Sequence, residues 1–481
     1  MSISLRHLFA KHGLEGMLIS IRNSLKNHPN GEQMSMRSAH GILFTPVSGN
    51  GFLRGCRDPN SVRIDLVPGL VNLEVLRGVL PSWVPIAGNT NLLAGNVDHI
   101  GETRVVEGIL TESKISGTDF PFKPWHLYYD WNFHVKADPQ YTYLLSATNI
   151  QDKNGDFECE WDTSVLPQWA WPQTGNRICI IGRWIYDCGH PTANGHKTEI
   201  HPPKAIAWFR WEAIKFAQNV NAVRANIATI YLGSKGGYWD QPINNQDYTF
   251  DLYLPNKIHV DSVPIWNIIP KTSLPVFPVI TPYPNDDPKL LRITIPLKGS
   301  LPTLEEYGVI VSGGWSDPHG IEALKSKHLR IVVNSISIED NEIFQRDEWY
   351  IYIGINGRWN FWKNLDSGRT SLDFILELDL YSGDFINITA CGFEADEVDN
   401  IMGKDIGLSW TDVSNSSKLE QNAKKIRNGF LSGIGAGIDP NMENESDIGT
   451  ISILHSPDKT GVFTVSSNKN IYSITYKVEV A

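Results

Sequence analysis

Long apolar runs and cysteines are both scarce in this chain of 481 residues. No stretch reaches the ~20 consecutive apolar residues that a membrane-spanning helix needs. The five cysteines are scattered and none forms a C-x-x-C pair, which argues against a disulfide scaffold and favours a reducing compartment. The N-terminal residues also lack the apolar core and small-residue cleavage site of a secretory signal. We therefore expect a cytoplasmic protein without a transmembrane segment.

Basic residues are too few and too dispersed to form a face for nucleic acid. Lys and Arg number 42 against 53 Asp and Glu, which gives a formal charge of −11. Because phosphate contacts supply much of the affinity for a duplex, nucleic-acid-binding proteins usually carry a basic stripe. The dinucleotide fingerprint and the G-x-S-x-G elbow are missing as well. We expect a small-molecule substrate as the partner, while the oligomeric state stays open.

Aromatic residues, in contrast, are abundant, with 16 Trp, 16 Tyr and 18 Phe. Strand-length runs of apolar and aromatic residues alternate with Gly, Asn and Pro turns along most of the chain. The segment Ser371–Leu380 shows the pattern most clearly, because apolar residues recur at every second position from Phe374 to Leu378. The sequence therefore predicts a mostly β fold with few helices.

Four segments are expected along the chain. Residues 1–35 have helical periodicity and predict an amphipathic helix docked on the body, with a membrane-surface anchor or a transit peptide as the alternatives. Residues 36–262 predict a barrel-like or irregular β domain. Seven prolines mark residues 263–288 as a connection. Residues 289–481 predict an antiparallel β-sandwich, in which Asn356-Gly357 forms a hairpin turn.

The densest group of chemically versatile side chains lies between Asp187 and His201. On an extended segment Glu199 and His201 leave the same face, about 6.5–7 Å apart. His190 from the preceding loop can close over that face, and the three groups then resemble the ligand set of open Zn²⁺ or non-haem Fe²⁺ sites. His196 is a fourth ligand or a proton shuttle, and Asp187 orients a ligand imidazole. The alternative is a hydrogen-bonded turn network without metal.

A second group, His126, Asp130 and His134, is spaced by four residues within an aromatic segment. This spacing places the three side chains on one face of a strand or of a helix. We assign His126 and Asp130 to the same catalytic site, where they support the metal ligands or contact the substrate. A half-buried strand with satisfied polar groups is the alternative.

Two further acidic groups have to be weighed. Glu158, Glu160 and Asp162 share one face of a strand, and we expect a solvated face there, with general acid catalysis as the alternative. In the C-terminal part the clustered carboxylates predict a Ca²⁺ site or a solvated loop. The calcium candidates are Asp384, Glu394, Asp396 and Asp399.

These patterns favour a metal-dependent enzyme that acts on a small, apolar or aromatic substrate. A divalent ion (Zn²⁺ or Fe²⁺) would activate a water for hydrolysis or leave an open position for redox chemistry. A competing interpretation is a β-sandwich binding module for a sugar, lipid or protein, Ca²⁺-dependent, with a structural His-rich loop. A third is a metal-free lyase or cyclase that uses only acid and base groups.

Overall fold

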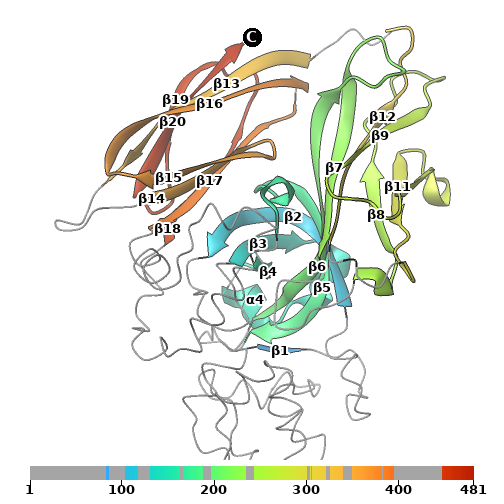
Figure 1. The fold of residues 1–481 in the computed structure, drawn as a ribbon, viewed down its shortest axis with the longest axis horizontal. Coiled ribbons are helices and arrows are strands. Elements are labelled where there is room, and N and C mark those ends of the chain that lie inside the picture. The colour runs from blue at the N-terminus through green and yellow to red at the C-terminus, as the bar shows by residue number, and fades with distance from the viewer. Residues whose placement is uncertain are drawn as a thin grey trace, which may run out of the picture.

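We describe the protein from a computed structural model (Figure 1). The structure describes residues 83–85, 103–116, 130–152, 154–162, 166–187, 197–233, 243–300, 304, 306–320, 326–339, 349–381, 383–394 and 447–481. The expected N-terminal helix (residues 1–35) lies outside these residues. Among them the fold is mostly β, as the sequence predicted, with one short α-helix.

Five strands close into a barrel in the central part of the molecule. Around the barrel they follow the order β2-β3-β4-β6-β5, and β5 pairs again with β2. All neighbours are antiparallel except β4 and β6, which run parallel. The barrel strands are β2 (Thr103–Ser116), β3 (Asp130–Ala137), β4 (Asp156–Asp162), β5 (Arg177–Asp187) and β6 (Thr198–Ile214). This order, with its single parallel pair between the third and fifth strands, is the connectivity of the OB-fold.

Alternation along the barrel strands sorts apolar from polar side chains. Trp131, Phe133 and Val135 of β3 enter the barrel core together with Phe157 and Cys159 of β4. The residues between them therefore lie on the outer face. Short elements connect or border these strands: η5 (Pro139–Leu144), α4 (Ala147–Asp152), η6 (Gln168–Ala170) and β1 (Trp83–Pro85), which pairs with β5.

Strand β6 is long enough to leave the barrel and continue into a larger sheet. Its C-terminal part pairs with β7 (Val223–Gly233), which is followed by β12 (Glu306–Trp315) and β9 (Pro264–Pro270). A second, three-stranded sheet packs on it through a shared apolar cluster. This sheet contains β10 (Val279–Pro282), β11 (Leu290–Ile295) and β8 (Tyr248–Tyr253), and η7 (Ile243–Asn245) and η8 (Pro284–Asp286) lie beside it in sequence.

The remaining strands form the antiparallel sandwich that the sequence predicted (Figure 1). One sheet has the order β16 (Gly368–Tyr381), β13 (Ser326–Ile338), β20 (Tyr472–Val480) and β19 (Gly461–Ser466). The other has the order β15 (Arg358–Leu365), β14 (Trp349–Ile355), β17 (Ile386–Glu394) and β18 (Asp447–His455). Asn356 and Gly357 have positive φ angles and join β14 to β15, which confirms the predicted hairpin.

Residues 263–288, which we expected to be a connection, contain two of these strands. β9 pairs with β12, and β10 pairs with β11, so sheet pairing runs across the proline-rich segment. Both are edge strands, where proline is tolerated because one side of the backbone needs no sheet partner. The sandwich strands then begin at β13.

The sandwich packs directly against the barrel. Tyr350 and Tyr352 of β14 belong to the barrel's apolar cluster rather than to the sandwich core. Gln173 crosses the same boundary, since its amide nitrogen donates to the carbonyl of Gly354 at 2.7 Å. In the described part of the chain, no helix is long and apolar enough to cross a membrane.

Candidate functional site

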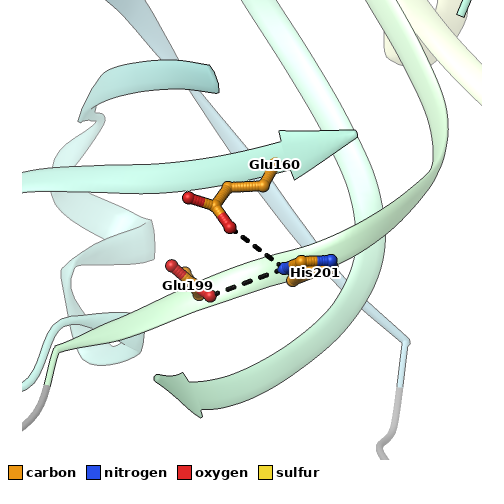
Figure 2. Close-up of side chains that lie close together, drawn as sticks. All are labelled: Glu160, Glu199 and His201. Atoms are coloured by element: carbon orange, nitrogen blue, oxygen red, sulfur yellow. Dashed lines mark ion pairs between the residues drawn. The ribbon is translucent and has the colours of Figure 1, made fainter. Parts of the chain in front are cut away.

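The carboxylates of Glu160 and Glu199 and the imidazole of His201 lie close together, with Glu160 on one strand and the other two on its neighbour (Figure 2). His201 Nδ1 lies 3.1 Å from Oε2 of Glu160 and 3.7 Å from Oε1 of Glu199. One potential ligand atom from each of the three residues lies within 4.8 Å of the others, and all three residues are buried. This geometry suits a small cation or a proton that the three groups share.

The parallel pairing of β4 and β6 creates this convergence. Glu158 lies opposite Glu199, and Cys159 lies opposite Ile200. Cys159 and Ile200 point into the barrel core, so the alternating residues on both strands point outward. One step further along the same direction, Glu160 reaches His201.

A buried lysine joins the carboxylates into a larger group, which we call the acidic cluster: Asp187, Glu158, Glu160 and Glu199 with Lys197, His134 and His201. Lys197 Nζ forms an ion pair with Glu158 and lies 3.4 Å from Asp187 and 3.5 Å from Glu199. Although Lys197 is close to Glu199 Oε2, that oxygen accepts no hydrogen bond from the described residues.

Strand β3 supplies the remaining polar contacts. Asn132 donates through its amide nitrogen to Glu158 at 3.1 Å and to Glu160 at 2.9 Å, so it sets the spacing between the two carboxylates. His134 Nε2 lies 3.3 Å from Glu158 and 3.7 Å from Glu112. Asn132 and His134 alternate with core residues on β3, which explains why they reach this face.

The start of β6 is fixed by a hydrogen-bond network from α4. Asn149 Oδ1 accepts from the backbone nitrogen of Thr198 at 2.9 Å, and its Nδ2 donates to the carbonyl of Thr198 at the same distance. Thr198 Oγ1 donates to the carbonyl of Leu144. Because Thr198 lies between Lys197 and Glu199, this network holds both charged side chains in place.

The surroundings in the acidic cluster shift the pKa values of Glu158 and Glu199 in opposite directions. Burial acts to raise the pKa of Glu158, but Lys197 and His134 outweigh burial and lower that pKa well below its ordinary value. Burial raises the pKa of Glu199, with Asp187 adding to the rise, despite the opposing charge of Lys197. For Lys197, burial acts to lower the pKa, but Glu158, Glu199 and Asp187 raise it well above the ordinary value. Lys197 therefore stays charged.

The structure brings some of the predicted site residues together, whereas others lie outside the described residues. Glu199 and His201 lie together, and Asp187 lies beside Lys197. His126, His190 and His196 lie outside the described residues, and so does the side chain of Asp130. Glu160 lies with Glu199 and His201, although we had assigned it to a separate acidic strand, and the predicted roles of the three histidines outside the described residues stay predictions.

Our expectation that Glu158, Glu160 and Asp162 form a solvated face was wrong for two of the three. Glu158 and Glu160 are 7% and 4% exposed, because Asn132, Lys197 and His201 satisfy their oxygens from neighbouring strands. Sequence reasoning missed Lys197 and Asn132 altogether. The only sequence signal was that Lys197 lies within the His-rich segment. That signal could not be interpreted before the strand pairing was known, because the pairing is what brings Glu158 to Lys197.

The calcium candidates are only partly described. Asp384 is buried, forms an ion pair with Arg224, and accepts from the backbone nitrogen of Tyr381 at 3.2 Å. The backbone of Glu394 ends β17, and Asp396 and Asp399 lie outside the described residues. A calcium site in this part of the chain stays a prediction.

The location of the acidic cluster on the barrel can be compared with other barrels of this connectivity. OB-folds bind their ligands on the face of the second and third strands and at the loops that flank it. In this chain those strands are β3 and β4, which carry Asn132, His134, Glu158 and Glu160. A shared fold does not imply a shared function, so this location on the barrel assigns no ligand to the acidic cluster.

Comparisons with known proteins add no function. No family model matches the chain, and no curated protein does. Among the solved structures that match is one of Extended-Synaptotagmin 2 that comprises its SMP domain and its two C2 domains, at 6% sequence identity and a TM-score of 0.19. The alignment covers 78% of this chain and 88% of the other. A likeness this weak carries no argument about the function of the acidic cluster.

Proposed function

We propose that the protein is a divalent-metal-dependent enzyme whose ion is held by Glu160, Glu199 and His201. The observation that carries the proposal is the convergence of these three side chains within 4.8 Å in a buried position. Two carboxylates and one imidazole leave a tetrahedral ion with an open position for water or substrate, as catalytic sites require. Zn²⁺ and Fe²⁺ are the ions we favour, because both accept nitrogen and oxygen ligands.

The charges in the acidic cluster support a bound cation. Among the described residues, four carboxylates face one ammonium group and two imidazoles. Counted over these groups alone, four negative charges exceed three positive ones even with both imidazoles protonated. Burying charge is costly, and a divalent ion beside Glu199 Oε2, which accepts no hydrogen bond from the described residues, would add positive charge at that point.

The chain's own residues have distinct tasks in this proposal. A bound divalent ion would supply Lewis acidity and lower the pKa of a coordinated water. Lys197 approaches Oε2 of Glu199, whereas His201 approaches Oε1, and Lys197 keeps Glu158 ionised. Asn132 fixes Glu160, and His134, in contact with Glu158, is placed to accept or release a proton.

We keep a small aromatic or apolar molecule as the substrate because the chain is rich in aromatic residues, with 16 Trp, 16 Tyr and 18 Phe. Trp184 of β5 does not line the acidic cluster, because it pairs with Ile200 and packs against the barrel core, on the face opposite Glu199 and His201. An acidic surface repels phosphate groups, which is why we do not propose nucleic acid as the partner.

Metal analysis of the purified protein tests the proposal. We expect Zn or Fe in a ratio near one per chain, and we expect His201→Ala to lose the metal. His328→Ala is the matched control, because His328 also contacts two carboxylates but is exposed, and it should keep the metal. Wild-type protein that takes up neither ion after chelation and reconstitution would overturn the proposal.

A metal-free acid–base enzyme is the second candidate. The separated pKa values of Glu158 and Glu199 favour it, since pairs of carboxyl groups with different pKa values serve as acid and base in many enzymes. This candidate predicts a protein without Zn or Fe in which Glu199→Gln abolishes turnover of a substrate that the wild type converts.

A further inference from the structure

Two irregularities in the β5–β6 ladder place two cationic side chains outside the regular pairing. The ladder shifts register on each side of the Gly182–Pro203 pair. Lys204 falls in one of these shifts and Arg183 in the other. Extra residues in a strand redirect side chains, and such bulges are frequent next to functional sites.

Lys204 is a buried cation without an acidic partner. The residue is 2% exposed, and its Nζ donates to Oδ1 of Asn245 at 2.6 Å and lies 5.9 Å from the ring centroid of Tyr248. No carboxylate of the described residues lies within ion-pair distance of Lys204, whose described polar and ring contacts are those to Asn245 and Tyr248. An ammonium group has three donors, so two of them remain available.

Two neighbouring groups make the same position favourable for negative charge. The hydroxyl of Tyr248 is buried and makes no hydrogen bond of ordinary geometry to the described residues, although the side chain of Gln246 is close enough to oppose the rise in the Tyr248 pKa that burial causes. Arg183 is buried as well, and burial lowers its pKa to about 9. Burial, together with the charge of Arg183, lowers the pKa of Lys204 to about 8. A buried ammonium group that lies near a second cation and lacks a carboxylate creates a demand for an anion.

We propose that Lys204, Arg183 and the Tyr248 hydroxyl form a binding site for a small oxyanion, such as a phosphate or carboxylate group. The side chain of Asn245 is exposed, so the site borders solvent at that residue. Lys204 lies three residues beyond His201 on β6 but shares no carboxylate with the acidic cluster. The oxyanion site therefore does not depend on the proposed metal.

Thermal unfolding in the presence of inorganic phosphate, with chelator-treated protein, tests this site. Ionic strength is held constant with NaCl, so that general screening does not contribute. We expect phosphate or acetate to raise the Tm of the wild type by a few degrees in a saturable manner. A phosphate response assigns phosphate groups to the site, and a response to acetate alone assigns carboxylate groups.

Two substitutions identify the residue responsible. Lys204→Met should weaken binding of the responding anion by at least about tenfold, while the Tm without the anion stays at or above that of the wild type, because an uncompensated buried charge is removed. Lys204→Arg should keep binding. Lys257→Met is the control, since Lys257 also lies over an aromatic ring, Trp315, but is exposed.

The titration of the wild type decides the proposal even if Lys204→Met fails to fold. A wild-type Tm that responds to phosphate and acetate no more than to NaCl would overturn the proposal. An unchanged response in Lys204→Met would overturn it too, because the anion would then bind elsewhere.

Discussion

Lys197 illustrates how a single side chain can hold a buried acidic group together. It contacts Glu158, Asp187 and Glu199 from one ammonium group, and it is 4% exposed. Each of these carboxylates would be costly to bury alone. A lysine at this point therefore offsets part of the negative charge of the acidic cluster.

Replacing Lys197 with methionine should destabilise the protein strongly. The variant keeps the length of the side chain but leaves three buried carboxylates without their ammonium partner, a loss of about 3–5 kcal/mol in unfolding free energy. Thermal or denaturant unfolding measures this loss. Excess Zn²⁺ should restore part of the stability if the ion binds as proposed.

The control for this prediction is Lys327→Met. Lys327 forms an ion pair with Asp458, but both side chains are about half exposed, and exposed pairs contribute at most about 1 kcal/mol. If both variants lose the same small amount of stability, Lys197 does not hold the acidic cluster together.

At the scale of secondary structure elements, the turn between β14 and β15 carries contacts to a different part of the molecule. Gly357 has a φ of +75°, and a Cβ atom at this position would lie 2.3 Å from Cη2 of Trp208. Trp208 is a barrel residue whose indole nitrogen donates to the carbonyl of Ala170 at 2.8 Å. The hairpin therefore fits onto the barrel only with glycine at this position.

Gly357→Ala should lower the unfolding free energy by roughly 2–4 kcal/mol, because backbone strain adds to a clash that the buried indole cannot avoid. Gly299→Ala is the matched control. Gly299 has a φ of +74° and no atom within 4 Å of its Cβ position, so that variant loses only the backbone contribution of about 1 kcal/mol. Equal effects of the two variants in thermal unfolding would contradict the close fit on Trp208.

Local patterns in the sequence predicted single strands and hairpins well. The alternation in β16 and the Asn356-Gly357 pair identified a strand and a hairpin correctly, because both signals depend on neighbouring residues. Glu160 was not recognised as a partner of His201, because their meeting depends on the parallel pairing of β4 with β6. That pairing joins strands separated by β5, and no local pattern reveals it.

For the whole molecule, the contact between β6 and the sandwich is charged as well as apolar. Arg358 of β15 donates to both oxygens of Glu212, at 2.5 and 2.8 Å, and Arg210 donates to Oε1 at 2.8 Å. Burial acts to raise the pKa of Glu212, but Arg210 and Arg358 outweigh it and lower the pKa to about 2.

The contacts of Glu212 with Arg210 and Arg358 predict that the protein loses stability as the pH falls. Because the pKa of Glu212 is lowered on folding, its contribution is complete above the ordinary carboxyl pKa of about 4.5 and disappears as the pH falls through 2. The shift corresponds to about 3 kcal/mol. The stability difference between wild type and Glu212→Gln should be largest at neutral pH and vanish near pH 2 in thermal unfolding. A difference that does not change with pH would contradict this assignment.

The overall class could be predicted from composition and alternation, whereas the arrangement of the sheets could not. Prolines in residues 263–288 indicated a connection, yet edge strands accommodate them. Likewise, Tyr350 and Tyr352 pack on the barrel core. From the sequence alone, both side chains could equally have been expected to face the sandwich. Both outcomes depend on contacts between residues far apart in sequence.

The location of a bound ion tests the central claim most directly. Crystals grown with Zn²⁺ or Fe²⁺ should show an anomalous scattering peak, collected at the absorption edge of that metal, among the carboxylates of Glu160 and Glu199 and the imidazole of His201, at distances of about 2.0–2.2 Å. The peak should be missing in Glu160→Gln and present in Glu112→Gln, because the carboxyl group of Glu112 contacts Lys114 and His134 and is not among the three proposed ligands. No peak at these three residues in the wild type, with His201 still paired to Glu160, would contradict the account.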